Sequence, residues 1–504
     1  MNVRSPLRWL GRSLRCLLAS LLLVGLGFYL HYLWSGPALK PWHRARLTAE
    51  FTAHDYTSGA VTTLDQYRAQ ERRVMDQVRT EVYGKLASED RSPINRYDAG
   101  SRSDPRTWAT DWNRTFVMEP RGPPVAGALL LHGLTDSPYS LRSIGKALAA
   151  RGVRVVGLRL PGHGTAPAGL LTFEVDDLVA ATRLAMHDLR RSLGPGVPLY
   201  LVGYSNGAAL SVTYALDARD DASLPRPAGL VLISPAIGIT RLAALGRIRT
   251  GLSDLQGFGR AAWSDVEPEV DPFKYQSFSF HAAGVTQKLT STLARRIARL
   301  AEAGPVRGLP PILAFVSTVD STVQAEAVTD ALLGKLAPQG HELVLFDVNR
   351  LAVVQPLLVA DPAPLTRRLL AQPRRPYALS LITNASAQTL RAAERRVPAG
   401  GTIATERLLD VSWPQNVFSL SHVALPFPPD DPLYGYAAPR DDHHIQLGRV
   451  EIRGENGVLN VPGWMLTRQR SNPFHAYMAG RITDFVLRGR AVTPADDVVD
   501  QASW

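Results

Sequence analysis

The sequence predicts an α/β fold with a mostly parallel sheet flanked by helices. From residue 112 onward, short apolar strands alternate with helical stretches. The strands are nearly continuous apolar runs, which is typical of parallel strands buried on both faces. The expected strands are Thr115–Glu119, Ala126–Leu131, Val153–Leu158, Leu199–Val202, Leu230–Ser234, Ile312–Ser317 and Leu343–Phe346, and the expected helices lie near 140–151, 174–193, 206–218 and 323–337. Ligands of such sheets bind at the carboxyl ends of the strands, so functional residues should follow these strands.

Composition and charge exclude several classes of protein. Of the 504 residues, 45% are hydrophobic and 20% are charged, which are the values of a globular chain. The formal net charge is +11, but residues 1–46 hold seven basic and no acidic residues, so the other 458 carry only +4. No basic stripe with interleaved aromatic side chains is present, and we expect no nucleic-acid partner. Cys16 is the single cysteine, which excludes an intramolecular disulfide and cysteine-rich metal sites.

Residues 1–35 predict a basic tail followed by a membrane anchor. Four arginines precede the apolar run Leu17–Trp34, which contains no Asp, Glu, Lys or Arg. At about 1.5 Å per residue, a helix over this run nearly spans a ~30 Å hydrocarbon core. The arginines predict a cytoplasmic N-terminus, with the rest of the chain on the periplasmic side of a bacterial inner membrane. A cleaved signal peptide is the alternative, but residues 35–38 make a poor cleavage site.

Residues 36–92 are expected to form a stalk that carries one amphipathic helix. Thr63 and Gln66 have the spacing of a capping box, and apolar side chains then follow at near-helical spacing up to Leu86. The apolar face should pack on the body of the protein, because fewer than three clean heptads argue against a coiled coil. Residues 93–504 are expected to form the main domain.

A candidate nucleophile lies in the motif Gly203-Tyr-Ser205-Asn-Gly207. This G-x-S-x-G pattern follows a predicted strand and precedes a predicted helix. In that context, a sharp turn exposes the serine hydroxyl at the helix N-terminus above the sheet. The alternative is a glycine-rich turn with a capping serine.

A candidate oxyanion hole follows an earlier strand, in His132-Gly133-Leu134. The backbone N–H groups of Leu134 and Asn206 would stabilise an alkoxide that develops beside the serine. Gly133 permits close approach of the backbone to a substrate. His132 is expected to be a structural, hydrogen-bonding residue.

Three motifs in this order carry a family resemblance: His132-Gly-Leu, then Pro161-Gly-His-Gly164, then Gly203-Tyr-Ser-Asn-Gly207. They resemble the α/β-hydrolase superfamily, most closely its branch of monoglyceride lipases, lysophospholipases and serine aminopeptidases. The resemblance covers about residues 112–350 and resumes near His422. It implies an α/β-hydrolase fold, a cap insertion, and a triad whose members follow the chain order serine, acid, histidine.

The acid and the base follow the nucleophile in this order. Asp320 comes directly after the strand Ile312–Ser317 and is the expected acid; Asp347 is its main competitor, and a helix-capping role is the alternative for Asp320. We expect His422 to be the base because it ends a short apolar run, as at the carboxyl edge of a strand. The other candidates occupy less suitable positions, namely His341, His443, His444 and His475.

Two insertions depart from a minimal fold. Residues 236–305 are expected to form a cap whose aromatic side chains either line an apolar pocket or pack the cap onto the body: Trp263, Phe273, Tyr275, Phe278 and Phe280. Residues 351–416 form the second insertion, and the strand-like run Tyr377–Thr383 within it could extend the sheet.

The expected protein is a membrane-anchored serine hydrolase that cleaves carboxylic esters through an acyl-enzyme, without a metal or an organic cofactor. The membrane position favours a lipid-like substrate, of the lysophospholipid or monoacylglycerol type. The alternatives are an acyltransferase, a catalytically silent membrane-tethered binding protein, and a serine aminopeptidase whose substrate ammonium would meet Glu267, Glu269 or Asp271. The oligomeric state is left open.

Overall fold

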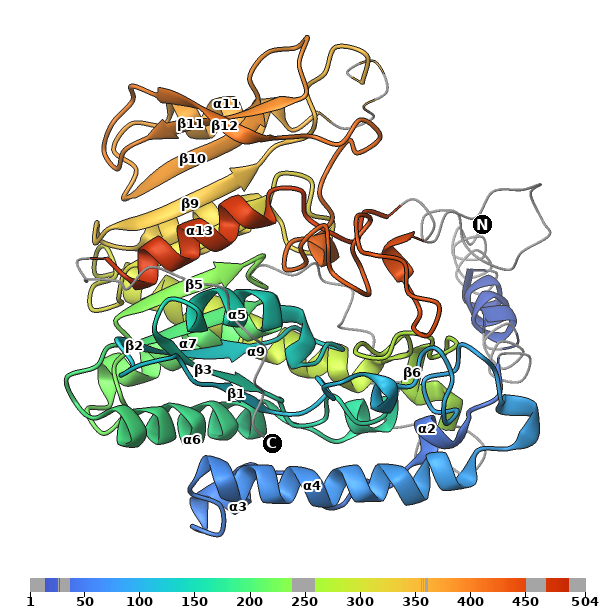
Figure 1. Cartoon of the computed structure of the whole chain (residues 1–504). Helices are drawn as coiled ribbons and strands as arrows, with labels where there is room; N and C mark the ends of the chain where they lie inside the picture. The colour runs from blue at the N-terminus through green and yellow to red at the C-terminus, as the bar shows by residue number, and fades with distance from the viewer. Residues whose placement is uncertain are drawn as a thin grey trace, which may run out of the picture.

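The computed structural model describes residues 14–25, 27, 37–237, 259–354, 356, 358, 361–449 and 468–488. Within them, a ten-stranded sheet has the order β1-β3-β2-β4-β5-β8-β9-β10-β11-β12 (Figure 1). Strands β3 to β10 of this order run parallel to one another, whereas β1, β11 and β12 pair antiparallel to their neighbours. The strands are β1 (Phe116–Met118), β2 (Ala126–Leu131), β3 (Val153–Leu158), β4 (Leu199–Tyr204), β5 (Gly229–Ile233), β8 (Ile312–Ser317), β9 (His341–Phe346), β10 (Tyr377–Asn384), β11 (Arg391–Val397) and β12 (Thr405–Ser412).

The sheet is buried on both faces because alternate side chains of a strand point into two separate cores. In β2, Leu129 and Leu131 belong to one core, whereas Ala128 and Leu130 belong to the other. Helices α6, α7 and α9 pack into the first core, and α5 and α13 into the second (Figure 1). The α-helices are α2 (Pro41–Arg44), α3 (Ala53–Thr57), α4 (Leu64–Glu81), α5 (Arg142–Ala149), α6 (Val175–Leu193), α7 (Asn206–Asp220), α9 (Phe280–Ala301), α10 (Ala325–Ala327), α11 (Ala363–Ala371) and α13 (His475–Val486).

All predicted strands are present, and the predicted mostly parallel sheet is confirmed. The helix predicted over 323–337 is wrong as one element: a short α10 is followed by a π-helical turn, Val328–Leu332, and a 3-10 turn, Leu333–Lys335. Val323, Val328, Thr329 and Gly334 have low helix propensity, which accounts for the irregular winding.

The second insertion extends the sheet, as its strand-like run suggested. After α11, β10 pairs parallel to β9, and β11 and β12 then follow as antiparallel strands. β11 and β12 were not expected, because their sequences are rich in charged residues rather than apolar. After β12 the chain returns from this edge to the middle of the sheet, where His422 O accepts a hydrogen bond from Tyr204 at the end of β4.

Residues 37–92 pack on the main domain through the predicted amphipathic helix. Thr63 caps α4 by accepting a hydrogen bond from Gln66 N–H, and the reciprocal side-chain bond of the capping box is present. The inner face of α4 is buried, including Tyr67, Val74 and Val78. In Figure 1, α4 runs beside α6 along one side of the domain.

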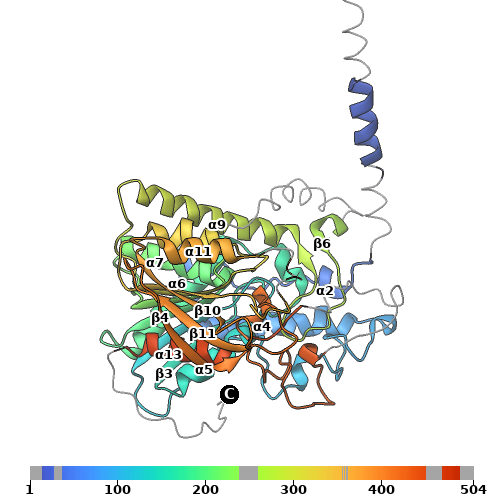
Figure 2. The ribbon, with the colours of Figure 1, turned by 90° about the horizontal axis from the view of Figure 1, so that it is seen from above.

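The described part of the predicted anchor, residues 14–25 and 27, is helical. In Figure 2 this helix points away from the body of the protein. Its large apolar side chains are exposed, namely Leu14, Leu17, Leu18, Leu21, Leu22, Leu23 and Val24. Residue 26 and residues 28–34 of the predicted run lie outside the described residues. Among the residues that are described, no helix has both the length and the apolar character needed to cross a membrane.

Candidate active site

Ser205 stands in a sharp turn between β4 and α7. Its backbone φ of 53° lies in a region that non-glycine residues rarely adopt. The turn is held by backbone bonds, because Ser205 N–H donates to Ile233 O at 2.9 Å and Ala236 N–H donates to Ser205 O at 3.1 Å. The side chain is half-buried, at the carboxyl edge of the sheet where the sequence predicts it.

The glycines of this turn are required by contacts with backbone. A Cβ at Gly203 would lie 2.5 Å from Ala208 Cα, and one at Gly207 would overlap the carbonyl oxygen of Leu131. Backbone of a central strand cannot move aside as a flexible side chain can.

We therefore expect Gly207→Ala to lower the free energy of unfolding by about 3 kcal/mol or more, at the upper end of overpacking effects. Urea unfolding monitored by fluorescence measures this. Gly196→Ala is the control, because an added Cβ at Gly196 meets no atom within 4 Å. Equal unfolding midpoints for the two variants would contradict the prediction.

His422 bridges Ser205 and Asp320. His422 Nε2 lies 3.0 Å from Ser205 Oγ, and His422 Nδ1 lies 2.8 Å from Asp320 Oδ2. The other carboxylate oxygen of Asp320 accepts hydrogen bonds from the N–H groups of Thr322 and Val323, both at 2.8 Å. The three candidate residues thus form one continuous hydrogen-bonded chain.

The environment of Asp320 favours its ionised form. Burial acts to raise the pKa of Asp320, but the bond from His422 and the N–H groups of Val323 and Thr322 lower it below its usual value. Because an ionised carboxylate can only accept, Nδ1 of His422 carries the proton and Nε2 is free to accept the serine proton. This is the tautomer that a general base requires.

The local structure predicted for His422 is wrong. Residues 417–421 form no strand, and His422 begins the 3-10 turn His422–Ala424. Residues 417–421 form a short apolar run for another reason, since Val417 and Leu420 are buried in the second core. In place of a strand partner, Asn349 N–H donates to Phe418 O and Asn349 Nδ2 donates to Val417 O.

The competing acid and bases are engaged elsewhere. Asp347 forms a two-pronged ion pair with Arg350, with both distances 2.9 Å. His341 lies at the start of β9, where it accepts from Ile312 N–H. His475 bonds Ser143 Oγ, and His444 bonds Asp441. His443 is exposed.

The two predicted oxyanion donors lie at the start of α7 and in the turn after β2. Asn206 is the first residue of α7, so its N–H belongs to the unpaired first turn of the helix. Leu134 belongs to the turn after β2, in which Thr135 has φ of 66° and Asp136 N–H donates to Gly133 O at 3.3 Å. A Cβ at Gly133 would lie 2.7 Å from Asp136 Oδ2, so a larger residue there would displace the Asp136 side chain.

Three contacts around the site carried no signal in the sequence. Tyr204 Oη donates to His422 O at 3.3 Å. Tyr275 N–H donates to Thr135 O at 2.9 Å, and Lys274 Nζ lies 3.0 Å from Asp136 Oδ1. The last two tie the predicted cap directly to the turn that contains Leu134.

The aromatic side chains of the predicted cap pack it onto the body. Phe273 stacks on Tyr139 with ring centroids 4.2 Å apart, and Tyr275 Oη accepts from Thr165 N–H. Trp263 is buried beside the ring of His43. Cap residues 238–258 lie outside the described residues.

Two of the three acidic cap residues are already bound within the protein. Buried Glu269 accepts hydrogen bonds from Ser277 N–H and Gln276 N–H, and buried Asp271 accepts from Tyr434 Oη. Glu267 is exposed. Glu269 and Asp271 therefore bind groups of the protein itself, and neither carboxylate is open to the ammonium group of a substrate.

Glu269 should make stability depend on pH. Burial is the main influence and raises the pKa of Glu269 from 4.5 to about 7, against the opposing effect of Arg96. The folded state therefore holds this proton more tightly than the unfolded state. The resulting stabilisation is complete below about pH 4.5 and is lost as the pH rises through about 7, a change of about 3 kcal/mol.

Urea unfolding at about pH 5 and about pH 8 tests this effect against Glu269→Gln. We expect the free energy of unfolding to fall more steeply with rising pH in the wild type than in the variant. If the free energy of unfolding falls equally with pH in the wild type and in Glu269→Gln, the pH dependence belongs to other groups.

The part of the chain that contains Ser205 and Asp320 is similar in sequence to known proteins. Residues 122–347 match the family model described as serine aminopeptidase, S33. The thermostable monoacylglycerol lipase of Bacillus sp. (strain H-257) is 30% identical over 198 residues, which cover 39% of this chain and 71% of the lipase.

Solved structures give similar coverage. A metagenome-derived lipolytic enzyme of the LipS and LipT pair is 23% identical, with 47% of this chain and 89% of that chain covered and a TM-score of 0.37. The monoacylglycerol lipase of Paleococcus ferrophilus is 19% identical, with 46% and 87% covered and a TM-score of 0.33. The sequence match to the Bacillus lipase confirms the superfamily resemblance, and the chain belongs to the serine aminopeptidase (S33) family of α/β-hydrolases as a serine hydrolase of the carboxylesterase and lipase type.

Proposed function

We propose that Ser205, His422 and Asp320 form the catalytic triad of an esterase that cleaves lipid-like carboxylic esters. The observation that carries the proposal is the hydrogen-bonded chain from Ser205 Oγ through His422 to Asp320. The substrate class is supported by the likeness to a monoacylglycerol lipase. Lysophospholipids and monoacylglycerols are the two substrate types to compare.

The proposed reaction is a two-step acyl transfer. Ser205 Oγ attacks the ester carbonyl while His422 Nε2 takes the hydroxyl proton, and Asp320 stabilises the imidazolium. The N–H groups of Leu134 and Asn206 bind the oxyanion; losing one such donor lowers kcat by about 10²- to 10³-fold. His422 then gives its proton to the leaving alcohol. In the second step His422 Nε2 takes a proton from a water molecule whose oxygen attacks the acyl carbonyl; the bond to Ser205 Oγ then breaks, His422 returns the proton to Oγ, and the carboxylic acid leaves.

Labelling with a fluorophosphonate probe and an ester panel tests this proposal on the full chain in detergent. The wild type should be labelled and should hydrolyse p-nitrophenyl esters, monoacylglycerol or lysophospholipid, whereas Ser205→Ala should do neither. Hydrolysis of aminoacyl p-nitroanilides in preference to all esters would favour an aminopeptidase. A folded wild type that is neither labelled nor active would overturn the proposal.

We also infer that residues 17–34 anchor the chain in a membrane with its N-terminus in the cytoplasm. The inference is supported by the exposed apolar side chains of residues 14–24 and by the arginines that precede the run. Carbonate washing of membranes should leave the full chain in the pellet and detergent should release it. Release by carbonate alone would contradict the anchor.

A further inference from the structure

The ring of His132 fixes the peptide group that contains the Leu134 N–H. His132 Nε2 lies 3.0 Å from Leu160 N, and His132 Nδ1 lies 2.9 Å from Gly133 O. A backbone N–H can only donate, so Nε2 accepts, and Nδ1 carries the proton that is donated to Gly133 O. Burial is the largest influence that holds the pKa of His132 well below its usual value, so the ring stays neutral in this tautomer.

Peptide planarity carries this constraint to the proposed oxyanion donor. The carbonyl of Gly133 and the N–H of Leu134 belong to one peptide unit, and the described residues contain no cis peptide bond. In a trans unit, the N–H points opposite to the C=O. By holding Gly133 O, His132 therefore aims the Leu134 N–H.

The same geometry recurs one step further from the site. Leu160 N–H, which holds His132, shares its peptide unit with the carbonyl of Arg159. That carbonyl accepts a hydrogen bond of 2.6 Å from Tyr67 Oη. One continuous chain of hydrogen bonds thus runs from Tyr67 through two peptide units and an imidazole to the Leu134 N–H. Tyr67 lies on α4, in the segment before the family-matched residues.

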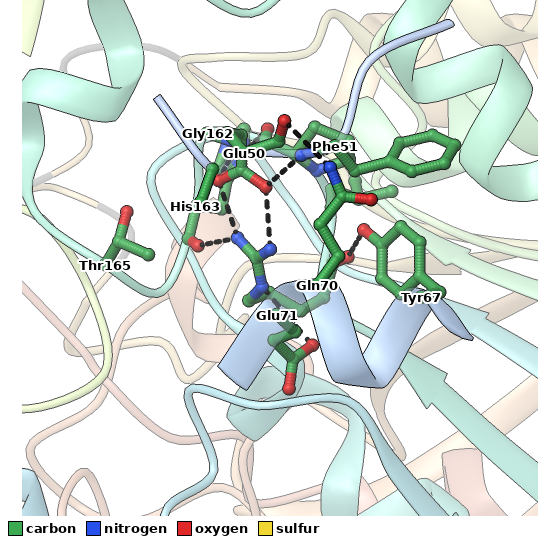
Figure 3. Close-up of polar contacts among 12 residues, drawn as sticks. Glu50, Phe51, Tyr67, Gln70, Glu71, Gly162, His163 and Thr165 are labelled. Carbon is green, nitrogen blue, oxygen red and sulfur yellow. Dashed lines mark hydrogen bonds and ion pairs between the residues drawn. The ribbon is translucent and has the colours of Figure 1, made fainter. Parts of the chain in front are cut away.

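Two carboxylates of the same segment, Glu50 and Glu71, hold the Arg159 side chain in place. Figure 3 shows both carboxylates beside the loop that contains Gly162 and His163. Glu50 accepts from both terminal nitrogens of Arg159, at 2.7 and 2.9 Å, and Glu71 accepts from Arg159 Nε at 3.3 Å. Glu50 also accepts from Gly162 N–H at 3.1 Å. Arg159 itself is 1% exposed, so the residue that carries the relaying carbonyl has little freedom to move.

We propose that Tyr67 is a positioning residue for ester hydrolysis, acting through Leu160 and His132 to orient and polarise the Leu134 N–H. The inference rests on the proposed function, in which this N–H binds the oxyanion. Successive hydrogen bonds polarise one another, by about 10–30% per bond, so the hydroxyl at the start of the chain strengthens the donor at its end. In this way Glu50, Tyr67 and Glu71 contribute to the reaction rate as well as to folding.

Tyr67→Phe tests the proposal, because it removes one hydroxyl and leaves the ring in place. We expect kcat for a p-nitrophenyl ester to fall by about 3- to 10-fold with KM unchanged, a fraction of the effect of losing a whole donor. The affinity for an aryl trifluoromethyl ketone, which forms an oxyanion on the serine, should fall by the same factor. Full-length protein is used throughout.

Tyr214→Phe is the matched control. Tyr214 is equally buried, and its hydroxyl also donates to a backbone carbonyl, Pro225 O at 3.0 Å, but this bond has no connection to the chain described above. Both variants should lose similar thermal stability, while only Tyr67→Phe should lose kcat and ketone affinity. A lower Tm with wild-type kcat and ketone affinity in Tyr67→Phe would overturn the proposal.

A second pair keeps the test decisive if Tyr67→Phe does not fold. Glu50→Gln weakens the hold on Arg159 and should lower kcat and ketone affinity together. Glu81→Gln is its control, because it replaces the carboxylate of a half-exposed ion pair with Lys85. It should change neither kcat nor ketone affinity. Wild-type values in Glu50→Gln would overturn the proposal. Esterase activity in Ser205→Ala would instead contradict the proposed function. The failure of that proposal is thus distinguishable from the failure of the Tyr67 proposal.

Discussion

His422→Ala should lower kcat/KM for a p-nitrophenyl ester by about 10⁵- to 10⁶-fold. The serine hydroxyl is a weak nucleophile unless a base removes its proton as it attacks. His422 Nε2 lies 3.0 Å from Ser205 Oγ, within reach of that proton. The same nitrogen then protonates the leaving alcohol, so the loss of this side chain removes both proton transfers. Initial rates over several protein concentrations measure the effect.

The control for this substitution is His443→Ala. His443 is exposed, and only its backbone N–H is bonded to Asp441 in the described residues, so its loss should leave kcat/KM within about 3-fold of the wild type. Unfolding curves of both variants should overlay that of the wild type within a few degrees. If His422→Ala retains activity while Ser205→Ala is inactive, the base is another residue.

The parts of the fold that sequence predicts well are those in which burial dictates composition. β2 is buried along its whole length, so its sequence is an uninterrupted apolar run that predicts a parallel strand. β12 lies at the edge of the sheet and exposes most of its side chains, so its charged residues resemble a loop. The apolar strands, including the edge strand β1, were therefore predictable, whereas the charged strands β11 and β12 were not.

The site was predictable to the extent that local geometry demands particular residues. Gly203 and Gly207 are needed by the turn around Ser205, and this need is visible in the sequence. His422 follows Asp320 by 102 residues, because β10, β11 and β12 are inserted between them. The sequence pointed to His422, which lies beside Ser205 and Asp320, although its predicted strand is absent; burial of Leu420 rather than a strand produces the apolar run.

Contacts between segments that lie far apart in the chain could not be predicted from the sequence. Tyr67 and the carbonyl of Arg159 are 92 residues apart, and one tyrosine on an amphipathic helix looks like any other core residue. Its bond to this carbonyl depends on where α4 lies against the loop after β3. Positioning residues of this kind are found from the structure alone.

The second large effect concerns the acid. Asp320→Asn should lower kcat by about 10⁴-fold with little change in KM or stability. An amide can offer its N–H to His422 Nδ1, so the imidazole would accept there and carry its proton on Nε2, facing Ser205. In that tautomer the ring cannot act as a base. The imidazolium formed during attack would also lose the carboxylate that stabilises it, 2.8 Å away.

Asp347→Asn is the matched comparison, because Asp347 ends the neighbouring strand and is also buried. Its carboxylate bonds Arg350 and Thr383 rather than a histidine. This variant should lose stability, because the buried side chain loses its charged pairing with the partly buried Arg350, but should keep kcat within about 3-fold of the wild type. The opposite pattern, a large kcat loss in Asp347→Asn and none in Asp320→Asn, would move the acid to β9. Because both carboxylates follow adjacent parallel strands, only this pair of measurements separates a catalytic acid from a structural one.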